Sequence, residues 1–155
     1  MKNNSTLFTL DASVFIKIII EENDTELTRK LLQYMTNVNV TILNPTLFEY
    51  EIHKICISHN IALASVTKFL EMYKNFNLEL IYPSLIDIEK AKKIIDSCKK
   101  ESGLPSFYDV IYHAIAINNN STFITADKKY YEKTKDFGSI ITLDSDQVAS
   151  ILDDM

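Results

Sequence analysis

The chain contains little glycine. Only two glycines occur among its 155 residues, Gly103 and Gly138, and neither lies in a turn that follows an expected strand. The dinucleotide-binding fingerprint and the P-loop both need glycines in such a turn, because the backbone there must approach phosphate groups closely. The sequence therefore lacks both motifs, and nucleotide-cofactor chemistry is disfavoured.

Cysteine and long apolar runs are also scarce. The two cysteines, Cys56 and Cys98, lie in apolar, helix-like stretches, so they offer neither a disulfide framework nor a CxxC metal knuckle, and we expect reduced thiols in the core. The richest apolar run, residues 14–20, is interrupted by Lys17 and is far shorter than the ~20 apolar residues that cross a bilayer. Residues 1–6 contain no apolar segment with a cleavage site. These features predict no membrane span and a cytoplasmic location.

Positive charge is in the minority, and the formal net charge is −5. Nonspecific affinity for nucleic acid comes mainly from Lys and Arg side chains that meet phosphates, so a broad electrostatic grip on nucleic acid is not expected. Acidic residues gathered in one metal site would nevertheless lower the net charge without excluding a phosphate substrate. Net charge alone does not decide the function.

The length and the pattern of the chain indicate one α/β domain that spans residues 1–155. Hydrophobic residues make up 46% and charged residues 24%, which is ordinary for a globular protein. Short β-branched or apolar runs alternate with segments of helical period, which is typical of an α/β fold with a mainly parallel sheet. The expected strands are residues 6–10, 39–43, 78–82, 122–125 and 139–143.

Two helices are well marked in the second half of the chain. After Ser84, apolar residues recur at spacings of three and four, and Ser84 with Asp87 resembles a capping box. The apolar positions of this first helix are Leu85, Ile88, Ala91, Ile95 and Cys98. A turn at residues 103–106 then precedes a second helical face that begins at Phe107.

Carboxylates follow two of the expected strands. Asp11 comes directly after the first strand, and Asp127 follows the apolar residues 123–126. In open parallel sheets, ligands bind beyond the carboxyl ends of the strands, so both residues are candidates for a functional site. Each is equally well explained as the N-cap of the next helix, because Asp is among the best N-cap residues.

Two further acids lie on expected helices. Thr46 and Glu49 have the spacing of a capping box, which assigns Glu49 a local structural role. Glu51 lies on the flank of the apolar face, where a charge needs a partner or a metal, although a solvated helix edge also explains it. Asp109 lies beside the apolar face near the start of its helix, where it either belongs to a site or complements the helix dipole.

The four acids gain significance as a set. Asp11, Glu51, Asp109 and Asp127 are all expected at the same edge of one sheet, where they would repel one another unless cations lay between them. Ligands that are all oxygen suit Mg²⁺ and Mn²⁺ rather than zinc. Such a site fits phosphodiester hydrolysis, which needs no protein nucleophile. The histidines show no evident pairing in the sequence, and we expect His53 and His113 at the surface or at the edge of the core.

Four segments that contain these acids resemble the acidic motifs of PIN domains, in the order of that family. They are residues 10–17 (LDASVFIK), 45–51 (PTLFEYE), 107–114 (FYDVIYHA) and 123–129 (FITADKK). The pattern is most similar to the VapC-type toxins of prokaryotic toxin–antitoxin pairs, and it covers nearly the whole chain. The resemblance implies a three-layer α/β/α fold with about five strands.

The resemblance also implies a function. It suggests a Mg²⁺- or Mn²⁺-dependent endoribonuclease whose metal ligands are Asp11, Glu51, Asp109 and Asp127. Ser13 and Thr125 fall where the family often places hydroxyls that orient the acidic cluster. Lys54 is a departure, because many toxin-like members have Asn at that position. The resemblance further implies a homodimer and, for a toxin, an antitoxin whose C-terminal segment blocks the groove.

Other interpretations involve different classes of protein. An RNA-processing PIN nuclease outside any toxin system would carry the same four acids, whereas a degenerate PIN fold would serve only for assembly. A phosphotransfer domain of the response-regulator kind needs an acidic pair just before the aspartate of its first strand, and one of the haloacid-dehalogenase kind needs Asp two residues after it. Thr9 and Leu10 precede Asp11 and Ser13 follows it, so neither phosphotransfer pattern fits.

The remaining charged residues have two explanations each. Asp144 and Asp146 precede the last expected helix and are expected as its cap and its first-turn acid rather than as metal ligands. A group of lysines around the motifs of Asp109 and Asp127 either meets RNA phosphates or forms a solvated rim. These lysines are residues 99, 100, 128, 129, 133 and 135.

Overall fold

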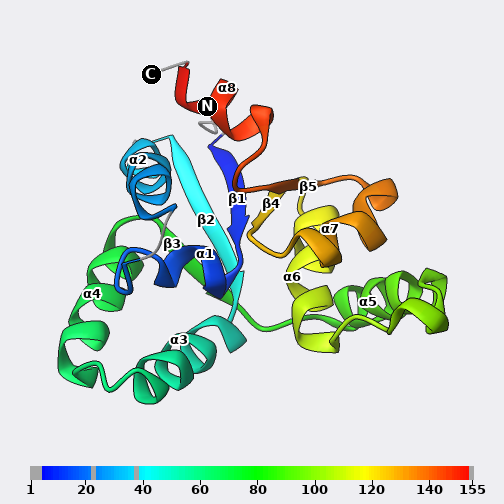
Figure 1. The fold of residues 1–155 in the computed structure, drawn as a ribbon, viewed down its shortest axis with the longest axis horizontal. Coiled ribbons are helices and arrows are strands. Elements are labelled where there is room, and N and C mark those ends of the chain that lie inside the picture. Colours follow the sequence, from blue (N-terminus) through cyan, green and yellow to red (C-terminus); the bar gives the residue numbers. More distant parts are fainter. Residues whose placement is uncertain (1–4, 22–23, 37–38, 154–155) are drawn as a thin grey trace.

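The protein folds around one parallel sheet. The computed structural model describes residues 5–21, 24–36 and 39–153. Its five strands are β1 (Thr6–Leu10), β2 (Val40–Pro45), β3 (Leu78–Ile81), β4 (Thr122–Thr125) and β5 (Ile140–Thr142). They lie in the order β3-β2-β1-β4-β5, and every neighbouring pair is parallel (Figure 1). The expected α/β fold with a parallel sheet is confirmed.

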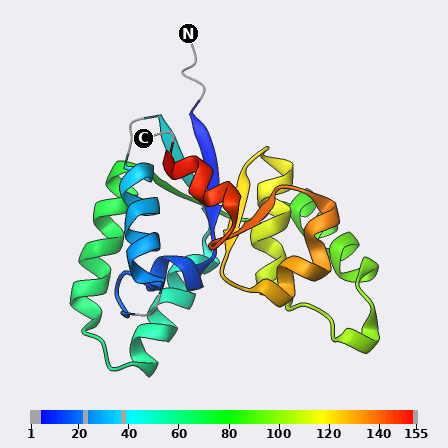
Figure 2. The ribbon, with the colours of Figure 1, turned by 45° about the horizontal axis from the view of Figure 1, so that its top comes forward.

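Helices cover both faces of this sheet. Those of the first half are α1 (Ala12–Ile16), α2 (Thr25–Met35), α3 (Leu47–Ser58) and α4 (Leu63–Phe76). Those of the second half are α5 (Leu85–Ser97), α6 (Phe107–Asn118), α7 (Lys128–Thr134) and α8 (Asp146–Asp153). Helices α1 to α4 lie on one side of the sheet and α5 to α7 on the other (Figures 1 and 2). The result is the three-layer arrangement that the resemblance implied.

The central strands are buried on both faces, which explains their nearly continuous apolar sequences. Phe8, Thr9 and Leu10 of β1 are all buried, and the Thr9 hydroxyl donates to the carbonyl of Leu43 at 2.9 Å. On the α1 side, the rings of Phe15 and Phe48 meet edge to face with centroids 5.2 Å apart. This core fixes the carboxyl end of β1 in the middle of the molecule.

Most strand boundaries agree with the sequence pattern. Strands β1 and β4 have the predicted bounds, whereas β2 continues through Asn44 to Pro45. Strand β5 begins one residue later than predicted, because Ser139 has a φ of +56° and is not extended.

The expected apolar face of α5 was partly wrong. The capping box of Ser84 and Asp87 is present, but Leu85 and Ile88 are exposed, and the buried residues are Asp87, Ala91 and Ile94. The Asp87 carboxylate accepts hydrogen bonds from Ser84 and from the Asn118 side chain of α6 at 2.8 Å each. This polar contact turns Asp87 toward α6, so the buried face is rotated away from Leu85.

No helix in the described ranges is long and apolar enough to cross a membrane. Cys56 is buried as a free thiol, and Cys98 is free but only partly buried. The structure thus places Cys56 in the core, as expected, and Cys98 at its margin.

Candidate metal centre

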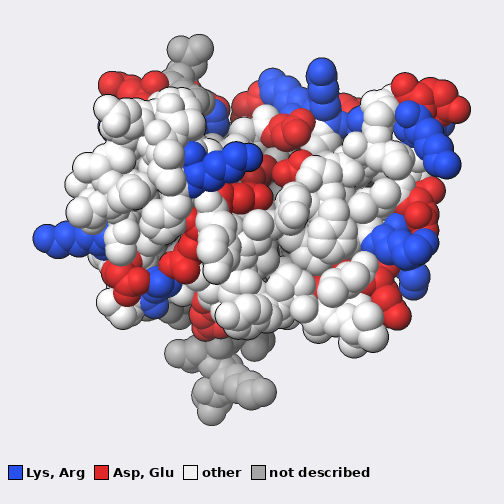
Figure 3. Space-filling model, turned by 90° about the horizontal axis from the view of Figure 1, so that it is seen from below, with Lys and Arg blue, Asp and Glu red and all other residues white. Residues whose placement is uncertain are grey.

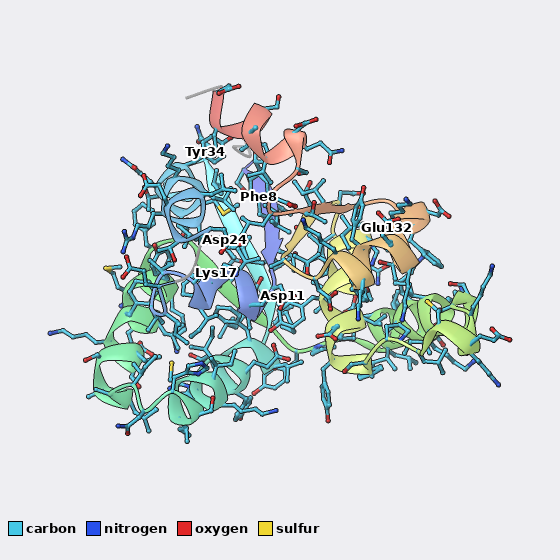
Figure 4. All side chains as sticks on the ribbon, in the orientation of Figure 1. Phe8, Asp11, Lys17, Asp24, Tyr34 and Glu132 are labelled. Carbon is cyan, nitrogen blue, oxygen red and sulfur yellow. The ribbon has the colours of Figure 1, made fainter. Side chains whose placement is uncertain are left out.

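After β1 the chain adds β2 and β3 on one side of the sheet, and then β4 and β5 on the other side. Strands β1 and β4 are therefore neighbours in the sheet although they are far apart in sequence. At such a switch point the adjoining loops diverge and leave a crevice at the carboxyl ends of the strands. Asp11 follows β1 at this place, in the middle of the fold (Figure 4). Figure 3 views the molecule from this end and shows acidic side chains gathered near the middle of the face. The topology therefore places Asp11 where such a crevice is expected in a parallel sheet.

The Asp11 carboxylate is held by two hydrogen bonds. It is the N-cap of α1, where its Oδ1 accepts the Ser13 N–H at 3.2 Å, and its Oδ2 accepts the Thr125 hydroxyl at 3.0 Å. Burial raises the pKa of Asp11 most, these hydrogen bonds lower it, and the charge of Asp127 raises it further. The net effect is a raised pKa, so an ionised Asp11 gains from a nearby cation.

Thr125 links the two aspartates of the switch point. Its Oγ1 donates to Asp11 and accepts the N–H of Asp127 at 3.0 Å. Asp127 is in turn the N-cap of α7, because its Oδ1 accepts the Tyr130 N–H at 2.9 Å. Thr125 thus contacts both aspartates through its hydroxyl.

Ser13 does not form the same kind of contact. Its hydroxyl lies near enough to Asp11 to lower the pKa of that carboxyl, but among the described residues the buried Ser13 Oγ has no hydrogen-bond partner of good geometry. An unpaired buried hydroxyl costs about 1–3 kcal/mol. A polar group bound next to Asp11 would remove that cost.

Glu51 comes to the crevice from α3. Its Oε2 accepts a hydrogen bond from the Tyr112 hydroxyl of α6 at 2.9 Å. Burial raises the pKa of Glu51 to about 7 as the largest cause, the bond from Tyr112 lowers it, and the charges of Asp11 and Asp109 raise it. Glu51 therefore has the partner that its flanking position on the helix required.

Glu49, two residues before Glu51, has a structural role as predicted, but the predicted reason for that role was wrong. Thr46 has helical backbone angles and makes no side-chain cap, so the predicted capping box of Thr46 and Glu49 is not formed. Glu49 instead forms an ion pair with Lys74 of α4, with Nζ and Oε1 at 2.7 Å. Glu49 does have a structural role, in the packing of α3 against α4.

Asp109 lies in the first turn of α6, whose N-cap is Ser106. A helix N-terminus alone favours the ionised form and lowers a carboxyl pKa. Here burial, followed by the charges of Asp11 and Asp127, raises the pKa of Asp109 to about 6. Burial and neighbouring acids therefore outweigh the helix dipole.

The charges of the four predicted acids act on one another in five of the six possible pairs, all except Glu51 with Asp127. The charge of Asp127 raises the pKa of Asp11, and the charges of Asp11 and Asp109 raise that of Glu51. The pKa of Asp109 is raised by the charges of Asp11 and Asp127. Within the described part of the chain, however, no three Asp, Glu, His or Cys side chains are close enough to form a metal-binding group. Oxygen-only donors, raised carboxyl pKa values and the unpaired Ser13 hydroxyl nevertheless suit a hard divalent cation.

Two residues of this region were missed from the sequence. Tyr112 is fully buried among aliphatic residues of α6, and its role depends on Glu51, which is remote in the sequence. The Asn44 side chain accepts the N–H of Leu10 and donates to its carbonyl, at 2.9 Å each, directly before Asp11. A buried amide in an apolar strand was the available signal, because such a group needs partners.

The lysine group is partly engaged within the protein. Lys128 pairs with Asp144, Lys135 pairs with Glu132 at 2.7 Å, and Lys133 donates to backbone carbonyls of the 102–103 turn at 2.7 Å. These contacts support the solvated-rim interpretation for half of the group.

Other polar residues differ in part from expectation. Ser145, not Asp144, caps α8, since its hydroxyl accepts the Val148 N–H at 3.3 Å, while Asp146 is the first-turn acid as predicted. His113 is fully buried rather than at the edge of the core, and its Nε2 lies 2.7 Å from the Gly138 carbonyl.

The fold and the acidic crevice define a class of α/β protein with a cluster of carboxylates at the switch point of a parallel sheet. The family model of the PIN domain matches residues 8–136. Because this match covers most of the chain, the protein belongs to the PIN-domain family.

Two solved structures are similar to this fold. VapBC2 from Rickettsia felis, crystallised with a DNA fragment from the VapBC2 promoter, has a TM-score of 0.66 and 16% identity, with 88% of this chain and 97% of that chain covered. PAE2754 from Pyrobaculum aerophilum has a TM-score of 0.58 and 16% identity, with 95% of this chain and 97% of that chain covered. At this identity the similarity shows a common fold. Comparison with curated protein sequences gives no match.

Proposed function

We propose that this protein is a Mg²⁺- or Mn²⁺-dependent endoribonuclease that hydrolyses RNA phosphodiester bonds, and that residues 1–155 form its single domain. The proposal is supported chiefly by one observation. Four carboxylates from separate segments of the chain lie around the switch point, and the charges of neighbouring acids contribute, after burial, to the raised pKa values of Asp11, Glu51 and Asp109. Such a cluster is costly to the fold unless a cation neutralises it.

Asp11, Glu51, Asp109 and Asp127 are the residues that would hold the metal. A bound divalent ion supplies activated water and neutralises the charge that develops on the phosphate. The protein contributes orientation: Thr125 holds Asp11 through its hydroxyl, and Tyr112 holds Glu51 in the same way. Side chains already fixed by hydrogen bonds lose less freedom when they bind a ligand, so these contacts favour metal binding.

The biological role we propose is that of a toxin in a toxin–antitoxin pair, in the cytoplasm, as a homodimer blocked by an antitoxin. The structural similarity to a VapBC protein and the family membership support this role. An RNA-processing PIN nuclease is the alternative within the same chemistry, and a short neighbouring reading frame for a DNA-binding antitoxin would distinguish the two. A catalytically inactive PIN module is the alternative of another class, and the presence of all four acids argues against it.

The test is RNA cleavage with Mn²⁺ by the purified protein and by matched variants. We expect the wild type to cleave and EDTA to stop it. Asp11→Asn, which removes the charge and keeps the shape, should abolish cleavage, whereas Glu49→Gln on the α4 side should leave it unchanged. Cleavage at the wild-type rate by a folded Asp11→Asn variant would exclude Asp11 from the site, and no cleavage by the wild type would favour the inactive module.

A further inference from the structure

A hollow of about 210 Å³ adjoins the candidate metal centre. Its walls are Leu47, Tyr50, Glu51 and Lys54 of α3 and Tyr108 of α6. The four residues of α3 are spaced three and four apart, so they share one face of that helix. Glu51 belongs both to the hollow and to the acidic cluster, so the hollow and the candidate metal centre are adjacent.

The two tyrosines of this hollow are unusually exposed for large aromatic side chains. Tyr50 is 75% exposed and Tyr108 is 61% exposed, so core packing does not explain either ring. Each directly precedes a proposed metal ligand, Glu51 or Asp109. The Tyr108 ring also meets that of Phe107 edge to face, with centroids 6.3 Å apart.

Lys54 supplies the positive charge of the hollow. It is exposed, and its charge lowers the pKa of Glu51, so the ammonium group acts electrostatically on the metal centre. This residue is the departure from the asparagine that many toxin-like members have there. A cation beside exposed aromatic rings is the combination that binds single-stranded nucleic acid, in which the rings stack on bases and the cation meets a phosphate.

We propose that this hollow is a nucleotide subsite for single-stranded RNA, next to the phosphate that is cleaved. Tyr50 and Tyr108 stack on an unpaired base, and Lys54 contacts a phosphate of the same strand. The bases of a duplex are already stacked on one another, so the subsite selects unpaired RNA. This inference rests on the proposed nuclease function, because it takes the acidic cluster as the place of cleavage.

The test is the affinity for a short single-stranded RNA in Ca²⁺, which takes carboxylate ligands and so neutralises the cluster. Gel analysis confirms that the RNA stays intact during the titration. Tyr50→Ala and Tyr108→Ala should each weaken binding roughly 5- to 150-fold, the effect of losing one base–aromatic stack. Tyr50→Phe and Tyr108→Phe keep the ring and should bind nearly as the wild type does.

Two controls make the result specific. Tyr82 is 86% exposed but does not line the hollow, so Tyr82→Ala should leave the affinity unchanged. Lys54→Met should reduce the slope of log affinity against log salt by about 0.7, the contribution of one phosphate contact on a single strand. The same RNA in duplex form should bind more weakly, and the alanine variants should bind it as the wild type does.

The proposal is overturned if the wild type does not bind single-stranded RNA, or if the alanine variants bind it with wild-type affinity. The second result would assign the exposed rings to a protein partner. Cleavage with Mn²⁺ is measured separately, so that the two hypotheses fail independently. Ring-dependent binding without cleavage keeps the hollow as a binding site for single-stranded RNA and refutes the nuclease. Cleavage with unchanged binding by the variants keeps the nuclease and refutes the binding site.

Discussion

Neutralising one acid of the cluster should stabilise the metal-free protein. The replacement we choose is Asp109→Asn, because it keeps the shape of the side chain. The pKa of Asp109 is about 6 in the folded protein and 3.8 for an ordinary aspartate. One pKa unit corresponds to about 1.4 kcal/mol, so the whole difference corresponds to about 3 kcal/mol. Solvent screens part of this because Asp109 is only partly buried, and we expect a gain of about 1–2 kcal/mol.

The gain should depend on pH in a defined direction. A carboxyl whose pKa is raised by folding destabilises the folded state wherever it is ionised. At pH 8, Asp109 is ionised in both states, and the destabilisation of the wild type is complete. It diminishes as the pH falls through about 6, where the folded protein takes up the proton, and it is absent below about 4, where the unfolded chain is protonated too. The variant should therefore be more stable than the wild type at pH 8, but not at low pH.

The assay is thermal unfolding in EDTA, followed by calorimetry or circular dichroism at several pH values. For a chain of this length, 1–2 kcal/mol corresponds to a melting temperature about 2–8 °C higher at pH 8. The control is Asp96→Asn on the exposed side of α5, where loss of the Lys92 pair should cost at most about 0.5 kcal/mol. A natively folded Asp109→Asn variant that melts at or below the wild-type temperature at pH 8 would refute the destabilisation of the folded state by an ionised Asp109.

Three further predictions concern the same region. Mn²⁺ should stabilise the wild type by about 2.7 kcal/mol at a hundredfold excess over its dissociation constant, and so raise its melting temperature. Glu51→Gln should remove most of this response. An equal response in wild type and variant would exclude Glu51 as a ligand. Tyr112→Phe removes only the hydroxyl that holds Glu51, so calorimetric titration should show weaker Mn²⁺ binding. The control Tyr73→Phe, on the α4 side, should bind Mn²⁺ as the wild type does. Unchanged Mn²⁺ binding by Tyr112→Phe would show that this hydroxyl does not orient Glu51. Asn44→Ala leaves the buried backbone groups of Leu10 unpaired and should cost about 2–4 kcal/mol in chemical unfolding; a loss below about 1 kcal/mol would show that water replaces the amide.

Local patterns of the sequence were sufficient for much of the fold. The bounds of β1 and β4 and the start of α6 follow from apolar runs whose ends coincide with polar or turn residues, and these are properties of the segments themselves. The face of α5 could not be read in this way, because it depends on where Asn118 of α6 lies. A polar Asp87 therefore points inward while Leu85 points outward.

Asp11 and Asp127 were identified by their positions after strands, and Glu51 and Asp109 by their positions beside the apolar faces of helices. Their partners were harder to predict, since each partner comes from a different segment. Tyr112 lies 61 residues from Glu51, and Thr125 lies 114 residues from Asp11. Glu49 shows the limit of a local motif: the capping-box spacing was present, but helical backbone angles at Thr46 and the ion pair with Lys74 gave the side chain another role.

The alternative between helix cap and metal ligand, which the sequence left open for Asp11 and Asp127, does not require a choice. A carboxylate has two oxygen atoms and about four acceptor positions, whereas a cap uses one of these positions. In Asp127 the Oδ1 atom caps α7, and in Asp11 the cap uses Oδ1 and Thr125 binds Oδ2. Each cap occupies part of its carboxylate, so a helix cap and metal binding by the same aspartate are compatible. The same short turn after each strand therefore begins a helix and positions an acid.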